Sequence, residues 1–130
     1  LKVFEVVRDS RKAACERAHE AFSSGEEIRG CDLDRVTRGV ITDAGYGDYF
    51  VHRTGHSLHE CIHGNGAHLD DFETYDDRKL IPGTLFTVEP GIYMPEKGIG
   101  IRSEVDVYHT GQGAEVTGPP HQEELVRIEL

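Results

Sequence analysis

Histidines crowd the middle of the chain, where residues 55–68 read GHSLHECIHGNGAH. Within this stretch HECIH, residues 59–63, fits the pattern His-Glu-x-x-His. On a helix this pattern brings two imidazoles onto one face, where they bind Zn²⁺ while the glutamate acts on a bound water. A zinc protease is therefore the first hypothesis that these residue types suggest.

The residues around this motif argue against a zinc-binding helix. Gly55, Gly64 and Gly66 surround it, and glycine is a poor helix former. The longer pattern H-E-x-x-H-x-x-G-x-x-H needs a third histidine at position 69, but the chain has Leu69 there and His68 one position early. HECIH is therefore the weaker of two candidate metal sites.

A stronger candidate combines the histidines with acidic residues further along the chain. LFTVEPGIYM (85–94) and IGIRSEVDVYH (99–109) are rich in β-branched and aromatic residues and predict strands. Because successive strand residues face opposite sides, Glu89 and Glu104 each stand among apolar residues that face the other way. Carboxylates beside an imidazole form a site that suits Mn²⁺, Co²⁺, Fe²⁺ or Zn²⁺.

The elements that must position these residues begin with two helices. Residues 3–22 place apolar side chains at helical spacing, and Ser23-Ser24-Gly25 is expected to end that helix. A second helix is expected to start near Asp32 or Asp34, either of which can cap it. It is expected to stop at Gly45, where a left-handed residue is favourable.

The pattern changes after residue 48. Residues 49–51 predict a short strand, and ELVRIEL (124–130) predicts a closing strand after the two described above. HLDDFETYDDRKL (68–80) is polar and acidic, which is typical of a surface loop. Two helices followed by several strands predict an α+β fold with antiparallel pairing, in a single region over residues 1–130.

The composition argues against several classes of protein. The formal net charge of −10, from 24 acidic and 14 basic residues, argues against a nucleic acid binder. No stretch approaches the ~20 apolar residues that a membrane helix needs. Cys15, Cys31 and Cys61 form neither a disulfide framework nor a zinc knuckle, so free thiols in a reducing cytoplasm are expected.

Longer motifs agree in order and spacing with those of a known family. They are HRTGHS (52–57) followed by HGNG (63–66), LIPGTLFTVEPGIYMPEKGIGIRSEVDVY (80–108), the closing EVTGPPHQEELVRI, and DRVTRGVITDAGYGDYF on the second helix. In these motifs the chain resembles the pita-bread metallopeptidases, in the branch of Xaa-Pro aminopeptidase and prolidase. The resemblance covers essentially the whole chain. It implies the C-terminal half of the catalytic domain of an exopeptidase that hydrolyses Xaa-Pro bonds.

The resemblance implies roles for the matching residues. His56, Glu89 and Glu104 would be three of the five ligands of a site for two divalent ions, Mn, Co, Fe or Zn, with Glu104 bridging both. His63 would be the catalytic histidine that contacts the substrate and stabilises the transition state. In this interpretation the match of HECIH to the zinc pattern is a coincidence.

Two further residues would contact the substrate. His52 would line the substrate pocket, and Arg102 would orient the substrate or Glu104, whose strand face it shares. The substrate implied is a small peptide with proline at the second position.

Two aspartate ligands of that family have no counterpart here. The aspartates in the first half of the chain fall on helices or in turns and are interpreted as caps and surface charges: Asp9, Asp32, Asp34, Asp43 and Asp48. The chain alone would then bind one ion or none. A missing N-terminal half, or a second copy in a homo-oligomer, could complete the site. The alternative is an inactive pita-bread module that binds peptides or proteins.

Overall fold

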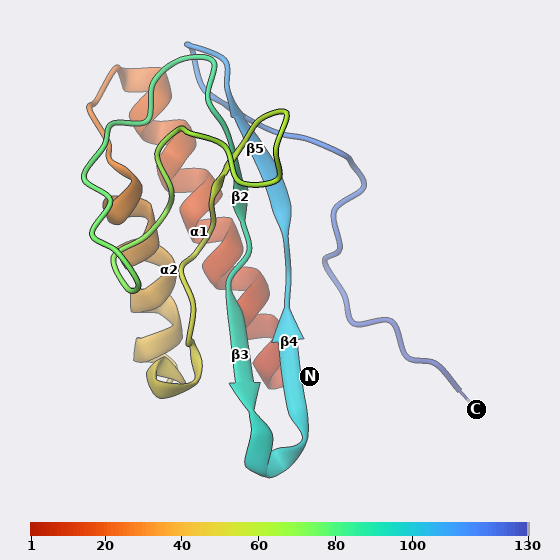
Figure 1. The fold of residues 1–130 in the computed structure, drawn as a ribbon. Coiled ribbons are helices and arrows are strands. Elements are labelled where there is room, and N and C mark those ends of the chain that lie inside the picture. The colour runs from red at the N-terminus through yellow and green to blue at the C-terminus, as the bar shows by residue number, and fades with distance from the viewer. Residues whose placement is uncertain (130) are drawn as a thin grey trace.

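Two α-helices pack beside a set of antiparallel strands (Figure 1). The computed structural model describes residues 1–129. The elements are α1 (Lys2–Ser24), α2 (Gly30–Asp43), the 3₁₀ helix η1 (Gly47–Tyr49), β1 (Ser57–Leu58), β2 (Leu85–Val88), β3 (Gly91–Met94), the 3₁₀ helix η2 (Pro95–Lys97), β4 (Ile99–Arg102), β5 (Val105–His109) and β6 (Ala114–Val116).

The two helices form where the apolar periodicity predicts them. The inward stripe of α1 includes Ala14 and Ala18, which are fully buried and small enough to let neighbouring elements approach closely. The helix ends at Gly25, whose φ of 72° is the left-handed conformation expected there. The second helix starts earlier than predicted, at Gly30, where the backbone N–H of the N-cap residue Arg29 donates to Oδ2 of Asp32 at 3.0 Å.

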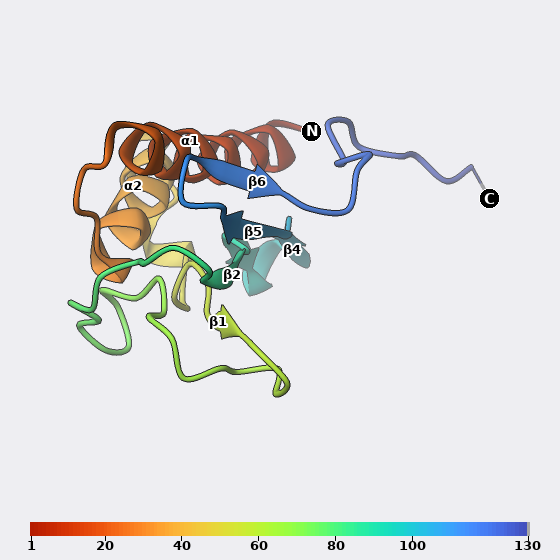
Figure 2. The same ribbon diagram turned by 90° about the horizontal axis from the view of Figure 1, so that it is seen from above.

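The strands form one sheet with the order β1-β2-β5-β6 and a separate hairpin of β3 and β4. Antiparallel pairing is confirmed: Phe86 faces Val107 across β2 and β5, and Ile92 faces Ile101 across β3 and β4. Figure 2 shows the four strands of the sheet in this order below α1. The predicted α+β fold is therefore correct.

Both long predicted strands are interrupted, and the interruptions lie at the same level. β2 and β3 are separated by Glu89 and Pro90, whereas β4 and β5 are separated by Ser103 and Glu104. The strand pairs on either side of the breaks, β2 with β5 and β3 with β4, keep the two segments in register. Between them, the N–H of Ser103 donates to the carbonyl of Pro90 at 3.3 Å. Both proposed carboxylate ligands thus stand beside one gap in the ladder.

The core lies between the helices and the sheet. Phe22 of α1 meets Phe86 of β2 edge to face, with ring centroids 6.4 Å apart. A second cluster joins Val7 and Ile41 of the helices to Ile92 of β3. Burying an apolar side chain of this size contributes about 1.5–3 kcal/mol, so the two clusters hold the interrupted strands against the helices.

Three sequence-based expectations were wrong. Residues 49–51 form no strand, because η1 turns the chain there and directs Phe50 into the core. Residues 124–129 contain no regular element, since they find no neighbouring strand to pair with, and Leu130 lies outside the described residues. Asp34, interpreted as a cap or surface charge, is fully buried.

The described part of the chain, residues 1–129, has no helix with the length and apolar character needed to span a bilayer.

Candidate metal centre

His56 and Glu89 meet at the break between β2 and β3. The Nε2 atom of His56 lies 3.2 Å from Oε1 of Glu89, and both side chains are largely buried. The other ring nitrogen, Nδ1, donates its proton to the carbonyl of Ser57 at 3.1 Å. In the neutral imidazole Nε2 therefore presents a lone pair to a carboxylate oxygen. Two acceptors in this position require a proton or a cation between them.

One threonine holds both of these residues. The hydroxyl of Thr87 accepts the backbone N–H of His56 at 2.9 Å and donates to Oε1 of Glu89, also at 2.9 Å. The close approach depends on Gly55, because a Cβ there would lie 1.9 Å from the carbonyl oxygen of Thr87. A residue without a side chain before His56 is therefore a condition of the geometry.

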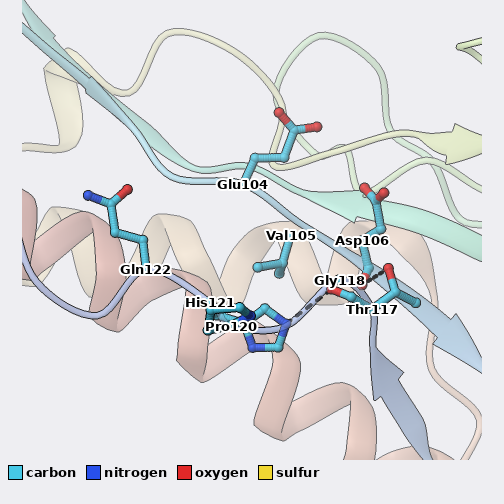
Figure 3. Close-up of a pocket in the computed structure, with 8 residues that line it drawn as sticks. All are labelled: Glu104, Val105, Asp106, Thr117, Gly118, Pro120, His121 and Gln122. Carbon is cyan, nitrogen blue, oxygen red and sulfur yellow. Dashed lines mark hydrogen bonds between the residues drawn. The ribbon is translucent and has the colours of Figure 1, made fainter.

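Glu104 lies at the second break and is exposed. Although the residue as a whole is exposed, partial burial of its carboxyl group raises the pKa of Glu104, and the negative charges of Glu89 and Asp106 raise it further. The carboxylate of Glu104 thus lies within electrostatic reach of Glu89, the other candidate carboxylate ligand. In Figure 3 the carboxylates of Glu104 and Asp106 point the same way from their strand, as the predicted alternation requires.

The pocket beside Glu104 has a volume of about 390 Å³. A hydrogen bond of 3.0 Å from Nε2 of His121 to the carbonyl of Thr117 supports its wall (Figure 3). Its lining residues are Glu104, Val105, Asp106, Thr117, Gly118, Pro120, His121 and Gln122.

The donor set fits a divalent ion in its chemistry. An imidazole nitrogen and carboxylate oxygens are ligands for Mn²⁺, Co²⁺, Fe²⁺ and Zn²⁺, and His56 and Glu89 already point at one place. Among residues 1–129, however, no group of three or more histidine, cysteine or acidic side chains is arranged to hold a metal. The structure thus brings together two of the three predicted ligands, with Glu104 at the edge of the group.

The helix that the zinc protease hypothesis requires is not formed. Residues 59–63 are a series of bends and are exposed to solvent, because β1 ends at Leu58 and the chain turns back. Within this loop, His63 places its ring edge against the ring of His56, with centroids 4.5 Å apart and planes at 87°. The catalytic candidate His63 therefore lies directly beside the candidate ligand His56.

A tyrosine that sequence reasoning missed joins the two predicted substrate residues. The Nε–H of Arg102 donates to Oη of Tyr93 at 2.7 Å, and Tyr93 donates in turn to Nε2 of His52 at 3.0 Å. Nδ1 of His52 donates to the carbonyl of Arg53, which fixes this direction. Burial lowers the pKa of His52.

Arg102 also faces a metal-ligand candidate. Its Nη1 lies 3.4 Å from Oε2 of Glu89, so the structure places it beside this carboxylate. The strand register contains the signal for Tyr93, because Arg102 pairs with Gly91, two residues away on the same strand face.

Known proteins resemble most of this chain. The model of metallopeptidase family M24 matches residues 1–111. The Xaa-Pro dipeptidase of Pyrococcus furiosus is 36% identical over 113 residues, which are 87% of this chain and 29% of that protein.

Solved structures show the same fold. The Xaa-Pro dipeptidase of Bacillus anthracis superposes with a TM-score of 0.77 at 35% identity, over 93% of this chain and 31% of that one. The X-Pro aminopeptidase of Thermotoga maritima gives a TM-score of 0.77 at 33% identity, over 93% and 32%. The chain spans about 30% of the length of these relatives. It belongs to metallopeptidase family M24.

Proposed function

We propose that this chain supplies His56, Glu89 and Glu104 to the metal site of a peptidase that hydrolyses Xaa-Pro bonds. The observation that supports the proposal most directly is the convergence of Nε2 of His56 and Oε1 of Glu89, which leaves two acceptors facing one position. The relatives named Xaa-Pro dipeptidase and X-Pro aminopeptidase support the substrate class.

The chemistry at this site combines bound ions with the chain's own residues. Divalent ions, two in the complete site with Mn²⁺ among the candidates, would activate a water and polarise the peptide carbonyl. His63 is exposed and touches His56, so it can donate a hydrogen bond to the oxygen on which negative charge develops. His52, which is hydrogen-bonded to Tyr93, would line the pocket for the substrate side chain.

The remaining ligands are proposed to come from polypeptide outside residues 1–130 or from a second copy of the chain. The alternative function, a binding module without activity, is supported by the finding that residues 1–129 hold no ready-made group of three ligands. The two functions differ in a measurable way, because a binding module retains little metal and hydrolyses nothing.

The deciding experiment measures bound ions per chain by elemental analysis after dialysis against Mn²⁺ and, separately, Zn²⁺. Hydrolysis of an Xaa-Pro dipeptide is followed in the same samples. Glu104→Ala should lower the metal content and any activity, whereas Asp106→Ala, on the same strand face, should leave both unchanged. The same metal content in Glu104→Ala and in the unaltered chain would contradict the assignment of Glu104 as a ligand.

A further inference from the structure

An ion pair on α2, with a buried carboxylate and a partly exposed guanidinium, bonds to the segment that precedes the proposed metal centre. Asp34 and Arg38 are one helical turn apart, with Nε–H donating to Oδ2 at 2.9 Å and Nη2–H to Oδ1 at 3.1 Å. The side chain of Asp34 is fully buried. Removing two charges from water is costly, and apolar residues of similar volume can fill such a place with equal or better stability. The distinctive property of the pair is therefore its set of directional bonds.

Both members of the pair hold the chain just ahead of the histidine ligand. Arg38 donates from Nη1 to the carbonyl of Phe50 at 3.0 Å and from Nη2 to the carbonyl of His52 at 2.9 Å. Oδ1 of Asp34 accepts the backbone N–H of Thr54 at 2.8 Å and its hydroxyl at 2.7 Å. One turn of helix thus fixes three alternate residues, Phe50, His52 and Thr54.

Thr54 extends this control to the second ligand. Its carbonyl accepts the backbone N–H of Glu89 at 2.7 Å. Two residues later, the N–H of His56 donates to Thr87, whose hydroxyl bonds to the same glutamate. A shift of Thr54 would therefore displace the His56 segment and the Glu89 segment relative to each other.

We propose that Asp34 and Arg38 are positioning residues of the metal site, which act by fixing Thr54 so that His56 and Glu89 meet. Neither residue is one of the proposed ligands or substrate contacts. The inference rests on the proposed function for the identity of the two ligands. A planar guanidinium is needed because a lysine cannot reach the carboxylate and two carbonyls in one fork.

The test compares Arg38→Lys with Arg35→Lys in the isotopically labelled 130-residue chain. Arg35 is a matched control, because it stands on the same helix but is exposed and pairs with Asp71. In Arg38→Lys the amide of Glu89 should exchange with solvent about tenfold faster. Nuclear Overhauser contacts between the ring of His56 and the Glu89 side chain should weaken. The amides of α1 should keep their protection from exchange. Unaltered exchange and contacts in Arg38→Lys would overturn the inference.

A second pair of variants guards against a general loss of folding. Thr54→Val removes the hydroxyl that bonds to Asp34 and contacts the hydroxyl of Thr37, and it should reproduce the loosened His56–Glu89 contact. Thr54→Ser keeps the hydroxyl and should behave like the unaltered chain. Equal behaviour of the two variants would also overturn the inference.

Added Mn²⁺ separates this inference from the proposed function. In the unaltered chain, paramagnetic broadening confined to resonances of His56, Glu89 and Glu104 supports the metal site, and Arg38→Lys should then need about tenfold more Mn²⁺ for the same effect. Broadening that is absent, or spread over the acidic surface, contradicts metal binding by these three residues in the isolated chain and leaves the positioning role to the other measurements. The exchange and contact measurements decide the positioning role in either case.

Discussion

The imidazole of His56 points its Nε2 atom at Oε1 of Glu89, 3.2 Å away. Since Nδ1 donates to the carbonyl of Ser57, a neutral ring leaves two acceptors opposite each other. The backbone enforces this approach, because the N–H of His56 and the carboxylate of Glu89 share the hydroxyl of Thr87. Such a contact is stabilised only when a proton or cation lies between the two atoms.

The first prediction separates the two histidine sites. His56→Ala should weaken Mn²⁺ binding by about 100-fold, because it removes a ligand atom rather than a supporting contact. His59→Ala should leave binding unchanged, since His59 lies in an exposed loop. Electron paramagnetic resonance of free Mn²⁺ during a titration measures both. The opposite order of effects would favour the HECIH motif.

The second prediction concerns the phenol that joins His52 to Arg102. Tyr93→Phe removes one acceptor for Arg102 and one donor for His52, so the free energy of unfolding should fall by about 1 kcal/mol. Urea unfolding measures the change. Tyr108→Phe is the control, because the side chain of Tyr108 is partly exposed on β5. Equal losses of unfolding free energy in the two variants would mean that the hydrogen bonds of the Tyr93 phenol do not stabilise the fold.

A third prediction concerns the start of α2. A Cβ on Gly30 would lie 1.8 Å from the carbonyl oxygen of His68, which is backbone and cannot move aside freely. Gly30→Ala should therefore destabilise the fold by about 2–4 kcal/mol. Gly39→Ala, in the same helix with open space around it, should stabilise the fold by about 0.5–1 kcal/mol. Thermal unfolding of both variants measures the two stability changes. Similar stabilities of the two variants would mean that the start of α2 can shift to make room for a Cβ on Gly30.

The fourth prediction concerns pH. Burial alone would raise the pKa of Asp76, but hydrogen bonds from the Arg78 guanidinium and from the backbone N–H groups of His68 and Arg78 lower it to about 2. Because the folded pKa lies below the unfolded value, the stabilisation is complete above about pH 4 and is lost as pH falls toward 2.

Asp76→Asn should therefore cost on the order of 1–2 kcal/mol near neutral pH, after solvent screening, and progressively less below pH 4. Asp77→Asn is the matched control, because Asp77 is exposed and adjacent. Urea unfolding at several pH values checks the trend. A cost for Asp76→Asn that stays constant down to pH 2 would contradict the role of its charge.

Local pattern was a sound guide to the elements. Apolar spacing located both helices, and period-two alternation correctly separated Glu104 from buried Val105 and Val107. Such patterns are readable because helix and strand periods are properties of the backbone itself. The same alternation could not locate the breaks at Glu89 and Glu104, which depend on how two strands pair.

The sequence by itself determined the family resemblance, the two helices, the antiparallel strands and the residue types available for metal chemistry. Only the tertiary structure decided that His56 contacts Glu89, that Tyr93 joins His52 to Arg102, and that Asp34 is buried. The physical reason is the distance along the chain over which each feature is set. Periodicity records what each segment needs from its immediate neighbours, whereas hydrogen-bond partners and burial are set by segments far apart in the chain.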